Sequence, residues 1–131
     1  MTPEKKTKKI KMKALELGFS SVGITTADDF TDYETEIRNR EDYKIWCDGP
    51  YGYLADGARP HSYYPQGKSI ICTTYGFGDF DYPKELTQYI GRAYLSRAYL
   101  PEPNSACGIR VKEFERYIRS LGIDIYNGRH V

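Results

Sequence analysis

The feature that most constrains the fold of this chain is a short apolar run between a turn and a loop. Ile70, Ile71 and Cys72 stand between a Pro-Gln-Gly-Lys turn and a loop of glycine, aromatic and acidic residues at 75–83. The run is too short and too rich in β-branched residues for a helix, which predicts a core strand over 68–77. Because apolar residues occupy both of its faces, we expect the strand to be central in a sheet.

Two helices have clear boundaries in the sequence. A basic helix over 3–17 can be capped by Thr2 and stopped by Gly18. The last helix, over 104–121, has Asn104 as its expected N-cap and is stopped by Gly122. Apolar residues at helical spacing predict the buried faces of these helices: Ile10, Ala14 and Leu17 with Leu15 alongside, and Val111, Phe114, Ile118 and Leu121.

The remaining segments are less regular. A strand is expected over 20–26, a helical region over 28–44 and a third strand beginning at IDIY, residues 123–126. Residues 47–60 contain five Gly or Pro residues and predict a loop with at most one helical turn. Residues 83–90 could begin a helix, and residues 94–100 suit either a strand or a helix.

This order of elements predicts an α+β fold, a layered α/β domain. The length of 131 residues is that of one domain. Because the chain ends soon after its third expected strand begins, we expect it to be the N-terminal domain of a longer protein. That unfinished strand and the tyrosine-rich surface would suit a homodimer or a further domain.

Charge and cysteine content limit the function classes. Six lysines precede residue 14, whereas the formal net charge of the whole chain is only +1. The N-terminal segment is therefore basic, and the rest of the chain is acidic. A nucleic-acid surface needs positive charge spread over one face, and no apolar run is long enough to span a membrane, so neither partner is expected. Three cysteines without close spacing predict reduced thiols in the cytoplasm, with Cys72 a small core residue, and no metal or iron–sulfur site.

Three blocks of the sequence resemble one known family. These are ALELGFSSVGITTADDF at 14–30, GYLADGARPHSYYPQGKSII at 52–71 and YIGRAYLSRAYLPEPNSACGIRVKEFERYIRSLG at 89–122. Their order and spacing are similar to the N-terminal domain of epoxyqueuosine reductases and corrinoid-dependent reductive dehalogenases, which are iron–sulfur oxidoreductases. The resemblance implies a nitroreductase-like domain that binds cobalamin. It also implies a C-terminal ferredoxin-like module, absent from this chain, whose two 4Fe–4S clusters supply electrons.

The resemblance also shows a departure. Epoxyqueuosine reductases carry an Asp-Tyr-His triplet near the start of the last helix, with the Asp as proton donor, and here that region reads NSACGIRVKEF. Reductive dehalogenases use a tyrosine near a basic residue, a role that Tyr94 or Tyr99 beside Arg92 or Arg97 would fill. A neighbouring guanidinium favours such a proton transfer by stabilising the phenolate.

The residues around the apolar strand are the candidate cofactor site. Glycines after the strand let a flat ligand approach the backbone, and aromatic rings can cover it. The expected contacts with cobalamin come from both ends of the strand: Lys68, Ser69, Tyr75, Gly76, Phe77 and Gly78.

Simpler interpretations stay open for each candidate. Gly67-Lys68-Ser69 lacks the frame of a nucleotide-binding loop and suits a plain turn. The aromatic loop can pack on its own domain, the tyrosines of RAYLSRAYL can be core residues, and His61 suits a solvated loop. The alternatives to an oxidoreductase domain are a non-catalytic module that binds a cofactor or partner and, less well supported, a flavin protein.

Overall fold

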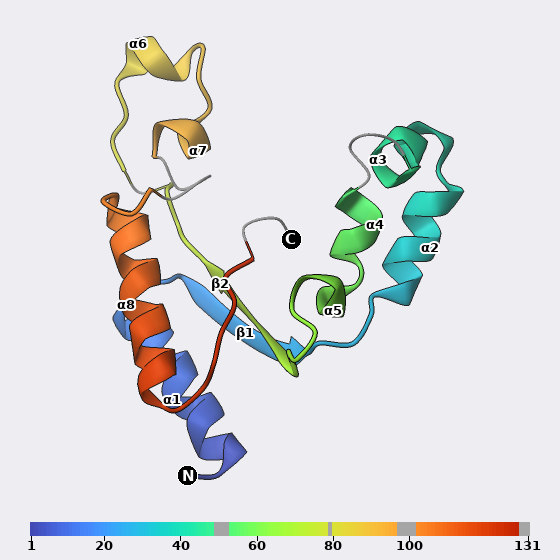
Figure 1. Ribbon diagram of the computed structural model, residues 1–131. Coiled ribbons are helices and arrows are strands. Elements are labelled where there is room, and N and C mark those ends of the chain that lie inside the picture. Colours follow the sequence, from blue (N-terminus) through green and yellow to red (C-terminus); the bar gives the residue numbers. More distant parts are fainter. Residues whose placement is uncertain (49–52, 79, 97–101, 129–131) are drawn as a thin grey trace. The chain divides into compact units, whose positions relative to one another are not determined.

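The computed structural model describes residues 1–48, 53–78, 80–96 and 102–128 (Figure 1). Contacts divide the chain into two compact units. Unit 1 comprises residues 1–24 and 71–125, and unit 2 comprises residues 25–70 and 126–131. The described residues form a mixed helix and strand structure, in agreement with the expected α+β class.

The sheet contains two strands, β1 (Ser21–Thr26) and β2 (Ser69–Thr74). The Ser20 amide donates to the Thr74 carbonyl at 2.8 Å, and the Ala27 amide donates to the Lys68 carbonyl at 3.2 Å. The start of β1 therefore lies beside the end of β2, so the two strands are antiparallel.

Three predictions for the sheet are wrong within the part of the chain that the structure describes. The apolar strand is not central, because its sheet has two strands, and residues 123–126 form no strand. Cys72 is exposed, because strand side chains alternate and those of Ile71 and Thr73 point to the covered face. Ile123 and Ile125 pack on the core of unit 1 as an extended segment instead.

In unit 1, α1 (Pro3–Glu16) begins and ends as its sequence predicts. The Thr2 hydroxyl accepts a hydrogen bond from the Lys5 amide at 3.3 Å. Gly18 has a φ of +92°, and the amides of Gly18 and Phe19 donate to the carbonyls of Leu15 and Ala14. This is the pairing of a Schellman motif, which explains why glycine stops the helix.

The other long helix of unit 1 is α8 (Ala106–Ser120). Its N-cap is Ser105 and not Asn104 as predicted, because the Ser105 hydroxyl accepts from the Gly108 amide at 3.0 Å. The same hydroxyl donates to the Glu102 carbonyl at 2.8 Å, which fixes the chain entering the helix.

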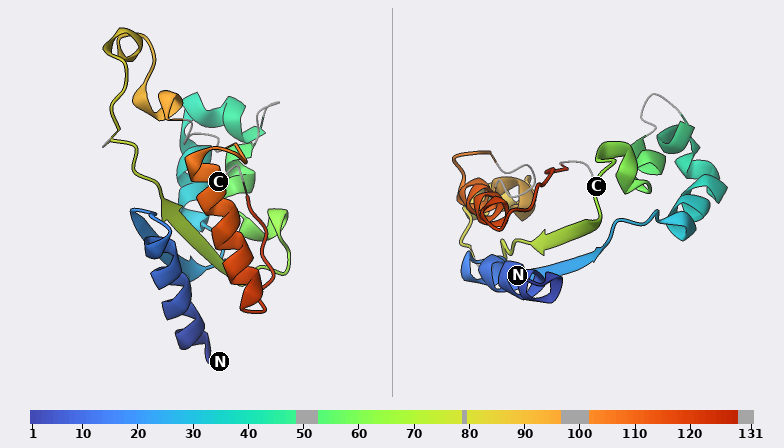
Figure 2. Two further views of the ribbon diagram at one scale, coloured as in Figure 1. Left: turned by 90° about the vertical axis from the view of Figure 1, so that its left-hand side faces the viewer. Right: turned by 60° about the horizontal axis from the view of Figure 1, so that its bottom comes forward.

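The core of unit 1 forms where α1 and α8 pack together on the strands. Its buried members are Ile10, Ala14, Phe19, Phe114 and Ile118, with the rings of Phe19 and Phe114 5.7 Å apart. Both views of Figure 2 show α1 and α8 at the end of the strand pair where β1 begins. Leu15 departs from the predicted core face, since 53% of its surface is exposed. Two short helices, α6 (Lys84–Thr87) and α7 (Arg92–Leu95), complete the unit.

Unit 2 consists mainly of short helices. They are α2 (Thr31–Asn39), the 3₁₀ turn η1 (Glu41–Tyr43), α3 (Lys44–Asp48), α4 (Tyr53–Gly57) and α5 (Pro60–Tyr63). The prediction of at most one helical turn in residues 47–60 is therefore wrong. Buried Ile37, Cys47 and Ala55 form the small core of this unit.

Candidate functional site

The segment that follows β2 in unit 1 forms a connected aromatic cluster. The rings of Tyr75 and Phe80 are stacked with centroids 6.5 Å apart, and Tyr82 meets Phe80 edge-on at the same centroid distance. The Tyr82 hydroxyl donates to the Phe77 carbonyl at 2.9 Å. Phe80 is 50% exposed, so its ring offers a flat apolar surface.

Arg110 on α8 holds the first ring of this cluster. Its Nη1 donates to the Tyr75 hydroxyl at 2.6 Å, and its guanidinium carbon lies 5.3 Å from the centroid of the same ring. Gly18 makes room for this arginine, since a Cβ at position 18 would lie 3.3 Å from Arg110 Nε. The pair therefore combines a phenol and a guanidinium at hydrogen-bond distance.

The two glycines of the segment have different surroundings. The Gly76 amide donates to the Ser20 hydroxyl at 2.9 Å, and a Cβ at position 76 would lie 2.8 Å from that oxygen. Close packing against Ser20 accounts for this glycine. A Cβ at Gly78, in contrast, would have no heavy atom within 4 Å. Open space beside the backbone at Gly78 is what a flat ligand would need.

The remaining predicted site residues lie elsewhere. Lys68 and Ser69 are exposed at the start of β2 and belong to unit 2, so the structure does not group them with Tyr75–Gly78 of unit 1. Tyr94 is on α7 and is 61% exposed. Arg97 and Tyr99 lie outside the described residues.

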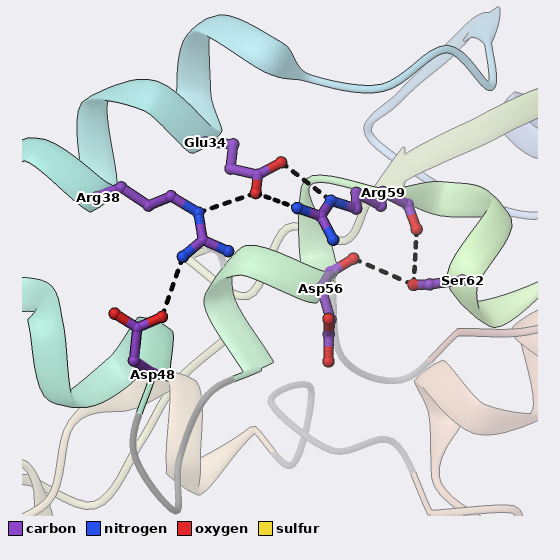
Figure 3. Close-up of polar contacts among 6 residues, drawn as sticks. All are labelled: Glu34, Arg38, Asp48, Asp56, Arg59 and Ser62. Carbon is purple, nitrogen blue, oxygen red and sulfur yellow. Dashed lines mark hydrogen bonds and ion pairs between the residues drawn. The ribbon is translucent and has the colours of Figure 1, made fainter.

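A second polar cluster in unit 2 is centred on Glu34 (Figure 3). Its carboxylate accepts hydrogen bonds from Arg38 Nε at 2.9 Å and from Arg59 Nε at 3.1 Å, and it also pairs with Arg59 Nη2. Arg38 reaches on to Asp48 at 3.0 Å. The Arg59 and Arg38 guanidiniums hold the pKa of Glu34 below its ordinary value of 4.5.

This cluster is a network of ion pairs that connects separate elements of unit 2. Two cations and two carboxylates are paired with one another, which links α2 to α3 and to the segment between α4 and α5. The Ser62 hydroxyl adds a hydrogen bond of 2.7 Å to the Arg59 carbonyl. Because each charge already has a partner, the cluster stabilises the helices of unit 2 and leaves no charge for a ligand.

Sequence reasoning missed Arg110, Ser20 and Glu34. The sequence does indicate that Arg110 lies near the core, because it precedes Phe114 by four residues and so lies at the edge of the predicted core face of the last helix. Glu34 and Arg38 also have helical spacing, but Arg59 follows 25 positions after Glu34 and only the fold brings it there.

Two further findings concern metal binding and membrane crossing by the described residues. Among them no group of three or more His, Cys, Asp or Glu side chains is placed to bind a metal ion. In the same part of the chain, no helix has the length and hydrophobicity needed to cross a membrane. The chain matches no family model, no curated protein and no solved structure.

Proposed function

We propose that this chain is a corrinoid-binding domain of an iron–sulfur oxidoreductase, similar to the nitroreductase-like domain of epoxyqueuosine reductases and reductive dehalogenases. The three sequence blocks quoted above support the family. Two observations on the segment after β2 carry the proposal: the ring of Phe80 is half exposed, and a Cβ at Gly78 would meet no heavy atom within 4 Å.

The residues present fit one face of a large flat ring. Phe80, backed by Tyr75, offers an apolar surface on which a corrin can lie. Gly78 lets the ring approach the backbone, whereas Gly76 is packed against the Ser20 hydroxyl. The expected contacts of Lys68 and Ser69, which belong to unit 2, remain predictions of the family resemblance.

The bound corrinoid would supply a redox-active cobalt, with electrons from 4Fe–4S clusters of a ferredoxin-like module. The chain's own contribution would be binding and proton supply. Tyr75 and Arg110 bring a phenol and a guanidinium to a hydrogen-bond distance of 2.6 Å, the residue types that the resemblance implies for a proton donor and its basic neighbour. Tyr94 and Tyr99, with Arg97, remain the donors that the resemblance implies.

The test is an anaerobic titration of the purified chain with reduced cobalamin, followed by its visible spectrum. The Gly78→Val variant adds a side chain whose Cβ would have no heavy atom of the protein within 4 Å, but which would block a ring lying on the backbone. Gly23→Val is the matched control, because Gly23 is also exposed with nothing within 4 Å of a Cβ. We expect a saturable spectral change for the wild type and the control, weakened at least tenfold by Gly78→Val.

Other outcomes separate the alternatives. Cobalamin binding without turnover in the presence of an electron donor would favour the non-catalytic binding module. A saturable change that Gly78→Val leaves intact would place the ligand elsewhere. A folded chain that gives no change would contradict the proposal.

A further inference from the structure

The outer face of α1 carries apolar and basic side chains together. Met12 and Leu15 are 61% and 53% exposed, although both lie on a helix whose opposite face, through Ile10 and Ala14, is buried in the core. Lys8 and Lys11 each precede one of the two by four residues, so all four side chains share one face of the helix. This second, exposed apolar stripe, Met12 and Leu15, lies outside the core of unit 1.

An open space of about 520 Å³ lies over this stripe. The residues that line it all belong to α1: Pro3, Glu4, Thr7, Lys8, Lys11, Met12 and Leu15. No second element forms a wall, so a peptide would have no groove to enter. A convex helix with exposed apolar side chains suits a broad, flat partner instead.

The positive charge of α1 indicates which kind of flat partner the helix would bind. Lys5, Lys8, Lys9 and Lys11 are exposed along a helix of 14 residues, about 21 Å long. Lys13, by contrast, is paired with Glu16 at 3.0 Å. Anionic lipid headgroups attract such a row of lysines, and Met12 and Leu15 can enter the boundary between headgroups and acyl chains. Nucleic acid would use the lysines but would leave the two apolar side chains in water.

From these observations we infer that α1 binds the surface of an anionic membrane through Lys8, Lys11, Met12 and Leu15. The helix lies on the bilayer and does not cross it. The stripe is short, so binding is reversible and depends on salt. This inference is independent of the proposed corrinoid site and departs from the expectation, drawn from the sequence, that no membrane is among the partners.

The experiment is co-sedimentation of the full chain with phosphatidylcholine vesicles, with and without phosphatidylserine. We expect binding only when phosphatidylserine is present, and loss of binding in high salt. The Lys8→Gln/Lys11→Gln variant should bind about 30-fold more weakly, as expected for two juxtamembrane lysines. Met12→Gln/Leu15→Gln should weaken binding by a similar factor, because its apolar contact is lost.

The matched control is Ile109→Gln/Lys112→Gln, which changes an exposed apolar and an exposed basic residue on α8. It should bind as the wild type does, and circular dichroism should give the same helix content for every variant. Equal sedimentation with both kinds of vesicle, or no sedimentation, would overturn the inference. So would α1 variants that bind like the control, or binding to a duplex RNA in place of the vesicles.

Discussion

The Arg110 guanidinium donates a hydrogen bond of 2.6 Å to the hydroxyl of Tyr75, 35 positions earlier in the chain. This bond joins α8 to the segment after β2 within unit 1. A Cβ at Gly18 would lie 3.3 Å from Arg110 Nε, so the glycine leaves space for the arginine. One contact therefore connects a helix stop, the last helix and the candidate ligand surface.

Arg110→Met should destabilise unit 1 by about 1–2 kcal/mol, because it keeps the aliphatic stem but removes a hydrogen bond from a charged donor. Chemical denaturation measures this difference. Arg116→Met, on the exposed part of α8, is the control and should change stability by less than about 0.5 kcal/mol. Equal effects of the two substitutions would show that the contact with Tyr75 does not stabilise the unit.

Gly108→Ala should destabilise unit 1 by about 3 kcal/mol or more, since a Cβ there would lie 1.8 Å from the Glu102 carbonyl oxygen. Backbone would have to move at the start of α8. Gly23→Ala, where a Cβ meets nothing within 4 Å, should instead be neutral or stabilising by up to about 1 kcal/mol. Thermal unfolding of both variants provides the comparison. A Gly108→Ala variant as stable as the wild type would contradict the close approach of Glu102.

Phe114→Ala should destabilise the chain by about 3–5 kcal/mol, because the ring is buried against Phe19 in the core of unit 1. Ile109→Ala removes an apolar side chain of the same helix that is 47% exposed, and it should cost less than about 1 kcal/mol. Urea unfolding of both variants distinguishes them. Similar losses would mean that the two faces of α8 are not buried as described.

Glu34→Gln should lower the unfolding temperature by a few degrees near neutral pH, and the loss should shrink in acid. Its two arginine partners lower the pKa of Glu34 in the folded chain, whereas the unfolded chain keeps the ordinary value of 4.5. The unfolded state thus binds the proton first as pH falls. The stabilising effect is therefore complete above about pH 5 and is lost as pH falls through the lower folded pKa.

Melting curves of the wild type and Glu34→Gln between about pH 3 and pH 7 test this dependence. Glu36→Gln is the control, because Glu36 is 63% exposed and pairs with Arg40 alone among the ion pairs described. It should have a smaller effect at every pH. A difference between the wild type and Glu34→Gln that stays constant down to pH 3 would contradict the role of the two arginines.

The helices with clear caps could be predicted from the sequence, and the sheet could not. Thr2, Gly18 and Gly122 act locally, so the boundaries of α1 and α8 follow from a few neighbouring residues; Gly122 adopts a φ of +71° at the stop of α8. The choice of Ser105 over Asn104 as N-cap depends on a hydrogen bond to Glu102, which a cap preference alone does not reveal. Sheet order depends on pairing between distant segments, and apolar residues at 70–72 did not indicate how many neighbours the strand has.

The candidate site was predicted in part. The aromatic and glycine residues after β2 indicated which segment forms the candidate site. The sequence did not indicate that Gly76 packs against the Ser20 hydroxyl, 56 positions away. Arg110 comes from a different element again. Contacts of this kind arise from the fold, so the sequence could indicate the types of residue at the site but not which of them meet.

Amide hydrogen exchange of the chain, measured with and without saturating reduced cobalamin, tests the corrinoid proposal most directly. We expect slower exchange in peptides covering residues 75–82 and at the start of α8, where Arg110 contacts Tyr75. Peptides of α2, in unit 2, serve as the internal reference and should exchange at unchanged rates. Unchanged exchange throughout residues 75–82, in a sample whose other amides show that it is folded, would contradict the proposed corrinoid site.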